Sequence, residues 1–119
     1  MLEQQVKEVI MHHLSSFQAN DMDEVMSDYT EESKLITPTQ VLSGKTEIRN
    51  FLTELSTHFP VGQSEINLEN LVIDDKLAYI VWNAKTPTLD ISLASDTFII
   101  EEGKIHQQTF IGQMQEVLN

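Results

Sequence analysis

The chain has 119 residues, no cysteine and a formal net charge of −12, because 19 Asp and Glu residues outnumber 7 Lys and Arg residues. This length predicts a single domain over residues 1–119, and the charge argues against nucleic acid and anionic membranes as partners. The absence of cysteine, of a secretion signal and of a membrane-spanning stretch predicts a cytoplasmic protein.

Two helices are predicted at the start of the chain. Apolar residues at spacings of three and four run from Leu2 to about Asn20, which is typical of an amphipathic helix. Asp21 and the Glu24 three positions later resemble a capping box. They predict a short second helix that extends through Tyr29.

A polar loop, two short strands and a third helix are predicted next. The loop is expected at Thr30–Ser33, and the strands at Lys34–Thr37 and Gln40–Leu42. Apolar residues at helical spacing then predict a helix over Lys45–Phe59, which the following proline ends.

Beyond Gly62 the apolar period changes from 3.6 to 2, which predicts four long antiparallel strands. They are expected at about 66–73, 77–82, 89–100 and 104–114. Asn70 is a candidate bulge site, and Gly103 can adopt the positive φ that the last hairpin turn requires. A short tail is expected at Glu116–Asn119.

The strand Leu77–Trp82 is apolar at nearly every position, so both of its faces are expected to be covered. Helices grouped ahead of a run of hairpins predict an α+β fold with three helices in the first half of the chain.

Three segments carry a resemblance to a known superfamily. They are Asn20–Asp21 with Tyr29 and Leu35–Pro38, then Leu42–Phe51, then Asp96–Ile105. In this order, over nearly the whole chain, they resemble the nuclear transport factor two-like superfamily, also called SnoaL-like or ketosteroid-isomerase-like. The resemblance implies a cone-shaped, curved antiparallel sheet wrapped around the long N-terminal helix, a cystatin-like α+β barrel with an apolar pocket. It also implies a homodimer that pairs through the outer face of the sheet.

Three positions can be compared with the catalytic positions of ketosteroid isomerases. Asp96 resembles, by its position, their neutral, hydrogen-bond-donating aspartic acid. In an apolar pocket the pKa of a carboxyl group rises, which would keep it protonated. His13 replaces their tyrosine on the inward stripe of the first helix and can donate or accept a proton. Thr37 replaces their general base, so classical steroid isomerisation is not expected. The alternatives are that Asp96 is exposed or bonded to neighbouring strands, and that His13 is an ordinary core histidine.

A hollow with mixed polar and apolar walls is predicted beside Asp96. Side chains two apart in a strand point the same way, so Phe98 shares a face with Asp96, and Phe110 with Gln108. The expected ligand-binding residues are Phe17, Tyr29, Thr37, Phe51, Trp82, Phe98, Gln108 and Phe110. So many aromatic residues favour a flat, apolar ligand, although packing in the core or at the rim is the favoured explanation for Phe51 and Trp82.

No metal or other cofactor is expected. His12 and His13 are neighbours on a helix, about 100° apart around its axis, and cannot both bind one ion. His58 and His106 have no ligand at metal-binding spacing.

Three functions remain open from the sequence. The first is an isomerase or cyclase in which Asp96 is the acid and His13 the base or orienting group. The second is a non-catalytic protein that binds a small apolar molecule, polyketide-like or steroid-like, in the same hollow. The third is a protein-association module whose hollow is filled by Phe17, Phe51 and Trp82.

Overall fold

A computed structural model describes residues 2–117 of the chain. The three helices are α1 (Leu2–Gln18), α2 (Met22–Met26) and α3 (Gly44–Ser56). The strands are β1 (Tyr29–Ile36), β2 (Val41–Ser43), β3 (Glu65–Asp74), β4 (Leu77–Lys85), β5 (Leu89–Glu101) and β6 (Lys104–Glu116). The α+β class, the three helices ahead of the hairpins and the four long strands are as predicted.

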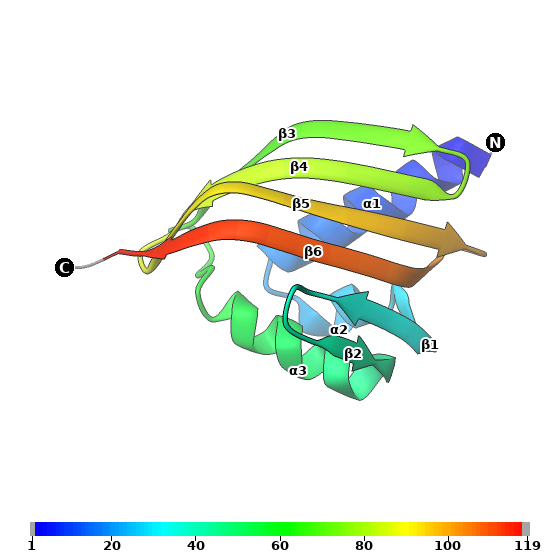
Figure 1. The fold of residues 1–119 in the computed structure, drawn as a ribbon, viewed down its shortest axis with the longest axis horizontal. Coiled ribbons are helices and arrows are strands. Elements are labelled where there is room, and N and C mark those ends of the chain that lie inside the picture. Colours follow the sequence, from blue (N-terminus) through cyan, green and yellow to red (C-terminus); the bar gives the residue numbers. More distant parts are fainter. Residues whose placement is uncertain (1, 118–119) are drawn as a thin grey trace.

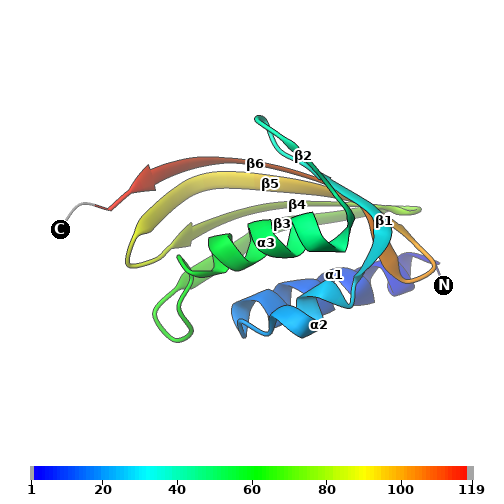
Figure 2. The same ribbon diagram turned by 90° about the horizontal axis from the view of Figure 1, so that it is seen from below.

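The strands form one sheet with the order β2-β1-β6-β5-β4-β3. Figures 1 and 2 show that it is strongly curved and that all three helices lie on one side of it. Two details of the predicted architecture are corrected. The sheet has two free edges, β2 and β3, and is not closed into a barrel. It is also not wholly antiparallel, because β1 pairs with β6 in parallel.

The predicted polar loop at Thr30–Ser33 is wrong, because these residues belong to β1, which begins at Tyr29. Their polar side chains are accommodated within the sheet. The Ser33 hydroxyl is fully buried, donates to the carbonyl of Ile105 and accepts a 2.8 Å hydrogen bond from the backbone N–H of Thr30. Polarity therefore misled the prediction, since the buried hydroxyl of Ser33 has one partner within β1 and another on β6.

Several predicted chain features are confirmed. Asp21 caps α2 by accepting a 3.3 Å hydrogen bond from the backbone N–H of Glu24. The pairing of β3 with β4 shifts register between Leu68 and Asn70, so a bulge is present at Glu69, next to the predicted Asn70. Gly103 has φ +75° in the last turn. Such bulges bend the strands, and here they accompany the curvature of the sheet.

The ends of three predicted segments are corrected. α2 ends at Met26, before the predicted Tyr29, which begins β1. α3 ends at Ser56, three residues before the predicted Phe59. Of the predicted tail Glu116–Asn119, the first residue belongs to β6, and Leu118 and Asn119 lie outside the described residues.

The core lies between the helices and the concave face of the sheet. Val6 and Ile10 of α1, Ile48 of α3, and Ile80 and Phe98 of the sheet are all at most 1% exposed. β4 is covered on this face only, since Tyr79 between the buried Ala78 and Ile80 is 38% exposed. Cover on the outer face of β4 therefore stays a prediction. No helix within residues 2–117 is long and apolar enough to cross a membrane.

Candidate functional site

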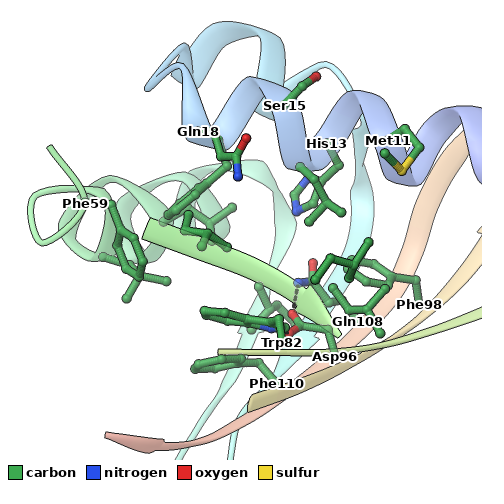
Figure 3. A pocket seen from close by; sticks show the side chains of 18 of the residues that line it. Met11, His13, Ser15, Gln18, Phe59, Trp82, Asp96, Phe98, Gln108 and Phe110 are labelled. Carbon is green, nitrogen blue, oxygen red and sulfur yellow. Dashed lines mark hydrogen bonds between the residues drawn. The ribbon is translucent and has the colours of Figure 1, made fainter. Parts of the chain in front are cut away.

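A cavity of about 220 Å³ lies between α1, α3 and the concave face of strands β3 to β6. Figure 3 shows the side chains that project into it from both sides. Most of the lining is apolar and includes Phe17, Phe51, Leu52, Leu55, Phe59, Ile66, Ile80, Trp82, Phe98 and Phe110. Trp82 and Phe110 stack with their ring centroids 6.1 Å apart and their planes 21° apart. The cavity thus presents aromatic faces to any molecule that enters it.

Asp96 is the one carboxylate among the described residues that line the cavity. The indole Nε1–H of Trp82 donates a 2.8 Å hydrogen bond to its Oδ1, and the Nε2–H of Gln108 donates a 2.8 Å hydrogen bond to its Oδ2. The hydroxyl of Tyr29 donates in turn to Oε1 of Gln108. Trp82 on β4 and Gln108 on β6 hold Asp96 directly, and Tyr29 on β1 holds Gln108, so the carboxylate is fixed from several strands.

The electrostatic state of Asp96 follows from this environment. Burial raises its pKa from 3.8 to about 6, and the hydrogen bonds from Trp82 and Gln108 oppose that rise. A group with this pKa is about nine-tenths ionised at pH 7. Because both oxygens accept N–H donors, Asp96 is placed to act as a hydrogen-bond acceptor or base. The expected role of a neutral acid is not favoured by this geometry.

His13 lines the cavity from α1, opposite the strands. Its ring packs edge-on against Tyr29 and Phe98, each with a centroid separation of 5.7 Å. Burial, and to a smaller extent the nearby charge of His12, lowers the pKa of His13 from 6.5 to about 4. The imidazole is therefore neutral at pH 7. In the view of Figure 3 the amide of Gln108 is drawn between His13 and Asp96.

The structure brings most of the predicted site residues together. Phe17, Phe51, Trp82, Phe98, Gln108 and Phe110 line the cavity with Asp96 and His13. Tyr29 lies behind the lining, where it is 1% exposed and contacts the cavity through Gln108. Thr37 is not part of the lining. Its hydroxyl oxygen accepts hydrogen bonds from the backbone N–H groups of Thr39 and Gln40, in the turn between β1 and β2.

Two residues of the site were missed from the sequence. Phe59 was placed at the end of a helix, but it lies beyond α3 and joins Phe17 and Trp82 at the cavity, with ring centroids 5.4 and 6.5 Å away. Asp28 lies behind His13, and no sequence signal links the two positions. Within residues 2–117, no group of three or more His, Asp or Glu side chains is arranged to hold a metal ion.

No protein-family model and no curated protein sequence matches the chain. Solved structures do match it. One is the epoxide hydrolase/cyclase-like enzyme SalBIII, described as having a role in pyran ring formation in the polyether salinomycin. It is 22% identical to this chain with a TM-score of 0.80, and the match covers 93% of this chain and 92% of SalBIII. A proposed SnoaL-like polyketide cyclase from Jannaschia sp. CCS1 is 16% identical with a TM-score of 0.80, over 94% of this chain and 88% of that chain. An NTF-2 like protein of unknown function from Burkholderia xenovorans LB400 is 15% identical with a TM-score of 0.77, over 95% of this chain and 86% of that chain.

This chain has the nuclear transport factor two-like fold. The predicted superfamily resemblance is thereby confirmed at the level of the fold. The solved structures that match this one include an enzyme and a protein of unknown function. Since one fold serves several functions, the function has to be argued from the cavity.

Proposed function

We propose that the cavity binds a compact apolar molecule and that Asp96 acts on it as a general base, in an isomerisation or ring closure without a cofactor. The observation that carries this proposal is the fixed, buried carboxylate in an otherwise apolar cavity. A base works best when its pKa lies near the operating pH, and burial moves the pKa of Asp96 to about 6.

The size and lining of the cavity support a small-molecule ligand. Its volume of about 220 Å³ lies below the roughly 300–1,000 Å³ of pockets for drug-sized ligands, which favours a compact ligand over a large one. Phe17, Phe51 and Trp82 line this space and do not fill it. This observation argues against a module that acts through protein association alone.

The roles of the polar groups follow from their contacts. Asp96 takes a proton from one atom of the ligand and returns it to a second atom of the ligand, so both the proton count of the product and the enzyme are unchanged at the end of the cycle. Trp82 and Gln108 hold the carboxylate in place through their hydrogen bonds. His13 is neutral and contacts the ligand from the opposite wall. The similarity to SalBIII and to the SnoaL-like cyclase supports this class of reaction.

Non-catalytic binding in the same cavity is the second candidate. It is favoured by Thr37, which stands at the position of the isomerase base but lies in a turn outside the lining. In this function Asp96 and His13 orient the ligand and transfer no proton.

A thermal-shift screen with steroids, polyketide fragments, fatty acids and compact terpenes tests both candidates. Binding to the folded protein raises the melting temperature. The matched variant Asp96→Asn keeps the shape of the side chain but cannot act as a base. Ligands that stabilise both proteins but are converted only by the wild type support catalysis, and conversion by neither protein supports binding alone. Failure of every compound to raise the melting temperature contradicts both candidates.

We further infer that the protein forms a homodimer through the outer face of the sheet. Asn70, Val81, Ser95 and Ile111 pair across β3 to β6 in one uncharged row on that face. Ile111 is 59% exposed, and Leu93 on the same face is 51% exposed. A second copy would bury these apolar side chains.

Light scattering coupled to gel filtration measures the mass of the protein in solution and so tests the proposed dimer directly. The wild type is expected at twice the mass of the chain, and Ile111→Lys at the mass of one chain. Val61→Lys, in a loop and 61% exposed, is the matched control that should leave the dimer intact. A monomeric wild type contradicts the inference.

A further inference from the structure

A second cluster of titratable side chains lies behind the cavity, where α1, α2 and the start of β1 meet. The Nδ1 atom of His12 is 2.9 Å from both carboxylate oxygens of Asp28, and its Nε2 atom is 3.1 Å from Oε1 of Glu24. Oδ2 of Asp28 is also 3.9 Å from Nδ1 of His13. Asp28 therefore lies between an imidazole at the surface and the imidazole that lines the cavity.

The backbone around Asp28 is fixed. Its carbonyl accepts a 2.7 Å hydrogen bond from the N–H of Ile105, and the ammonium group of Lys104 donates a 2.7 Å hydrogen bond to the neighbouring carbonyl of Ser27. Asp28 is only 7% exposed. Burial raises the pKa of Asp28, while the hydrogen bond and charge of His12 and the charge of Lys104 lower it. Glu24 and Asp28 raise the pKa of His12, which favours its protonated form.

The Nδ1 atom of His13 lacks a hydrogen-bond partner, and it is the one buried side-chain nitrogen or oxygen in the described part of the chain of which this is true. His13 itself is 5% exposed. Leaving such an atom unpaired is costly, and the carboxylate of Asp28 is an acceptor close by. An approach of about 0.8 Å would bring the 3.9 Å separation into the range of an N–H···O hydrogen bond.

The two ring nitrogens of His13 face different surroundings, Nδ1 the carboxylate of Asp28 and Nε2 the cavity. The edge-on packing of Tyr29 and Phe98 restricts rotation of the ring. With Nδ1 beside Asp28, Nε2 lies on the opposite edge of the imidazole, and Figure 3 shows this ring projecting from α1 into the cavity. In a neutral imidazole one nitrogen carries the proton and the other accepts, and the partner of one nitrogen decides the role of the other.

We propose that Asp28, held by His12, is a positioning residue that keeps His13 in the Nδ1–H tautomer, so that the cavity presents two acceptors, Nε2 of His13 and the carboxylate of Asp96. None of the described cavity-lining residues is Lys or Arg. The ligand that fits such a cavity is a compact apolar molecule with hydrogen-bond donors, such as an alcohol, phenol or amine. Carboxylates and simple ketones have no hydrogen-bond donor and do not satisfy these two acceptors. The ligand class rests on the proposed function, whereas the tautomer does not.

Long-range proton–nitrogen correlation spectra of uniformly ¹⁵N-labelled protein test the tautomer without any ligand. The chain has 4 histidines, so single substitutions assign their signals. At pH 7 we expect His13 to carry its proton on Nδ1. Asp28→Asn removes the charged acceptor and should move the tautomer ratio by about tenfold or more toward Nε2–H. Glu24→Gln, which alters the surface contact of His12 and keeps the carboxylate of Asp28, should change the ratio much less than Asp28→Asn does.

Matched probes test the ligand class in the wild type. 2-Naphthol and cyclohexanol supply a donor, while 2-naphthoate and cyclohexanone are close analogues without one. We expect each alcohol to bind at least about tenfold more tightly than its partner, because a buried acceptor without a donor is costly. Equal or tighter binding of the ketone or carboxylate overturns the ligand class.

The outcomes are separable. An Nε2–H tautomer in the wild type, or an unchanged ratio in Asp28→Asn, overturns the role of Asp28 whatever binds in the cavity. If Asp28→Asn does not fold, the tautomer of His13 measured in the wild type alone decides whether the proposed role of Asp28 stands. If none of the probes binds while His13 is found as Nδ1–H, the positioning role of Asp28 is supported and the proposed small-molecule function fails.

Discussion

Gln108 on β6 donates a 2.8 Å hydrogen bond to Oδ2 of Asp96 on β5, across the concave face of the sheet. The same amide accepts the hydroxyl proton of Tyr29 through its oxygen, so its orientation is fixed from both ends. The bond favours the ionised form of Asp96, while burial disfavours it. The balance of these two effects puts the pKa of Asp96 near 6, close enough to neutrality for proton transfer.

The ionisation of Asp96 can be observed through Trp82. The chain has 1 tryptophan, and its Nε1–H donates a hydrogen bond to Asp96. Indole emission responds to the charge of a hydrogen-bonded group, so we expect a fluorescence transition with a midpoint at about pH 6. Asp96→Asn should abolish the transition. A midpoint near pH 4 in the wild type would show that burial does not raise this pKa.

Removal of the amide of Gln108 is expected to destabilise the protein. Gln108→Leu leaves the hydroxyl of Tyr29 and one oxygen of Asp96 without a partner, at a cost of about 2–3 kcal/mol. The substitution should also raise the midpoint of the fluorescence transition. The hydrogen bond from Gln108 lowers the pKa of Asp96 in the wild type, so its loss lets that pKa rise. Urea unfolding at pH 7 measures the stability. Gln107→Leu, at the exposed neighbouring position, is the control and should cost less than about 0.5 kcal/mol.

The two buried ionisable groups of the cavity are expected to act oppositely on stability. The folded pKa of Asp96, about 6, exceeds its unfolded value of 3.8, so its contribution to the unfolding free energy falls as pH rises from about 4 to 6. The folded pKa of His13, about 4, is below its unfolded value of 6.5, so its contribution rises between about pH 4 and 6.5. Each effect is of the order of 3 kcal/mol. The wild type should therefore show little net change from these groups.

Single variants should separate the two contributions. Asp96→Asn leaves that of His13, so stability should increase from pH 4 to 6.5, and His13→Leu leaves that of Asp96, so stability should decrease. The double variant should restore the pH profile of the wild type. Urea unfolding at closely spaced pH values provides the measurement, and parallel profiles for the two single variants would refute the assignment of both pKa values.

Neighbouring residues of β1 test how the strand faces the core. Leu35 is fully buried and lines the cavity, whereas Ile36 is 40% exposed on the other face. Leu35→Ala should lower the unfolding free energy by about 2–5 kcal/mol, because it leaves a hole in packed surroundings. Ile36→Ala should change it by about 0.5 kcal/mol or less. Similar costs at both positions would mean that the outer face is also packed.

The local pattern of apolar and polar residues determined the order of helices and strands in this protein and the inward face of several strands. The helical spacing of Val6 and Ile10 and the alternation along β3 to β6 depend only on which side chains must leave water, so the α+β layout could be predicted from them. The two-residue period also placed Asp96, Phe98 and Phe110 on one inner face, because the direction of a side chain in a strand is fixed by parity.

Tertiary structure decided the rest. The polar segment Thr30–Ser33 is held in the sheet by the hydrogen bond from the Ser33 hydroxyl to the carbonyl of Ile105 on β6. β1 runs parallel to β6 only because the whole fold brings the two strands together. The charge state of Asp96 and the neighbourhood of His13 and Asp28 depend on burial and on contacts between residues far apart in the chain. Such contacts have no local signature, because the free energy of an ionisable group is set by what surrounds it in space.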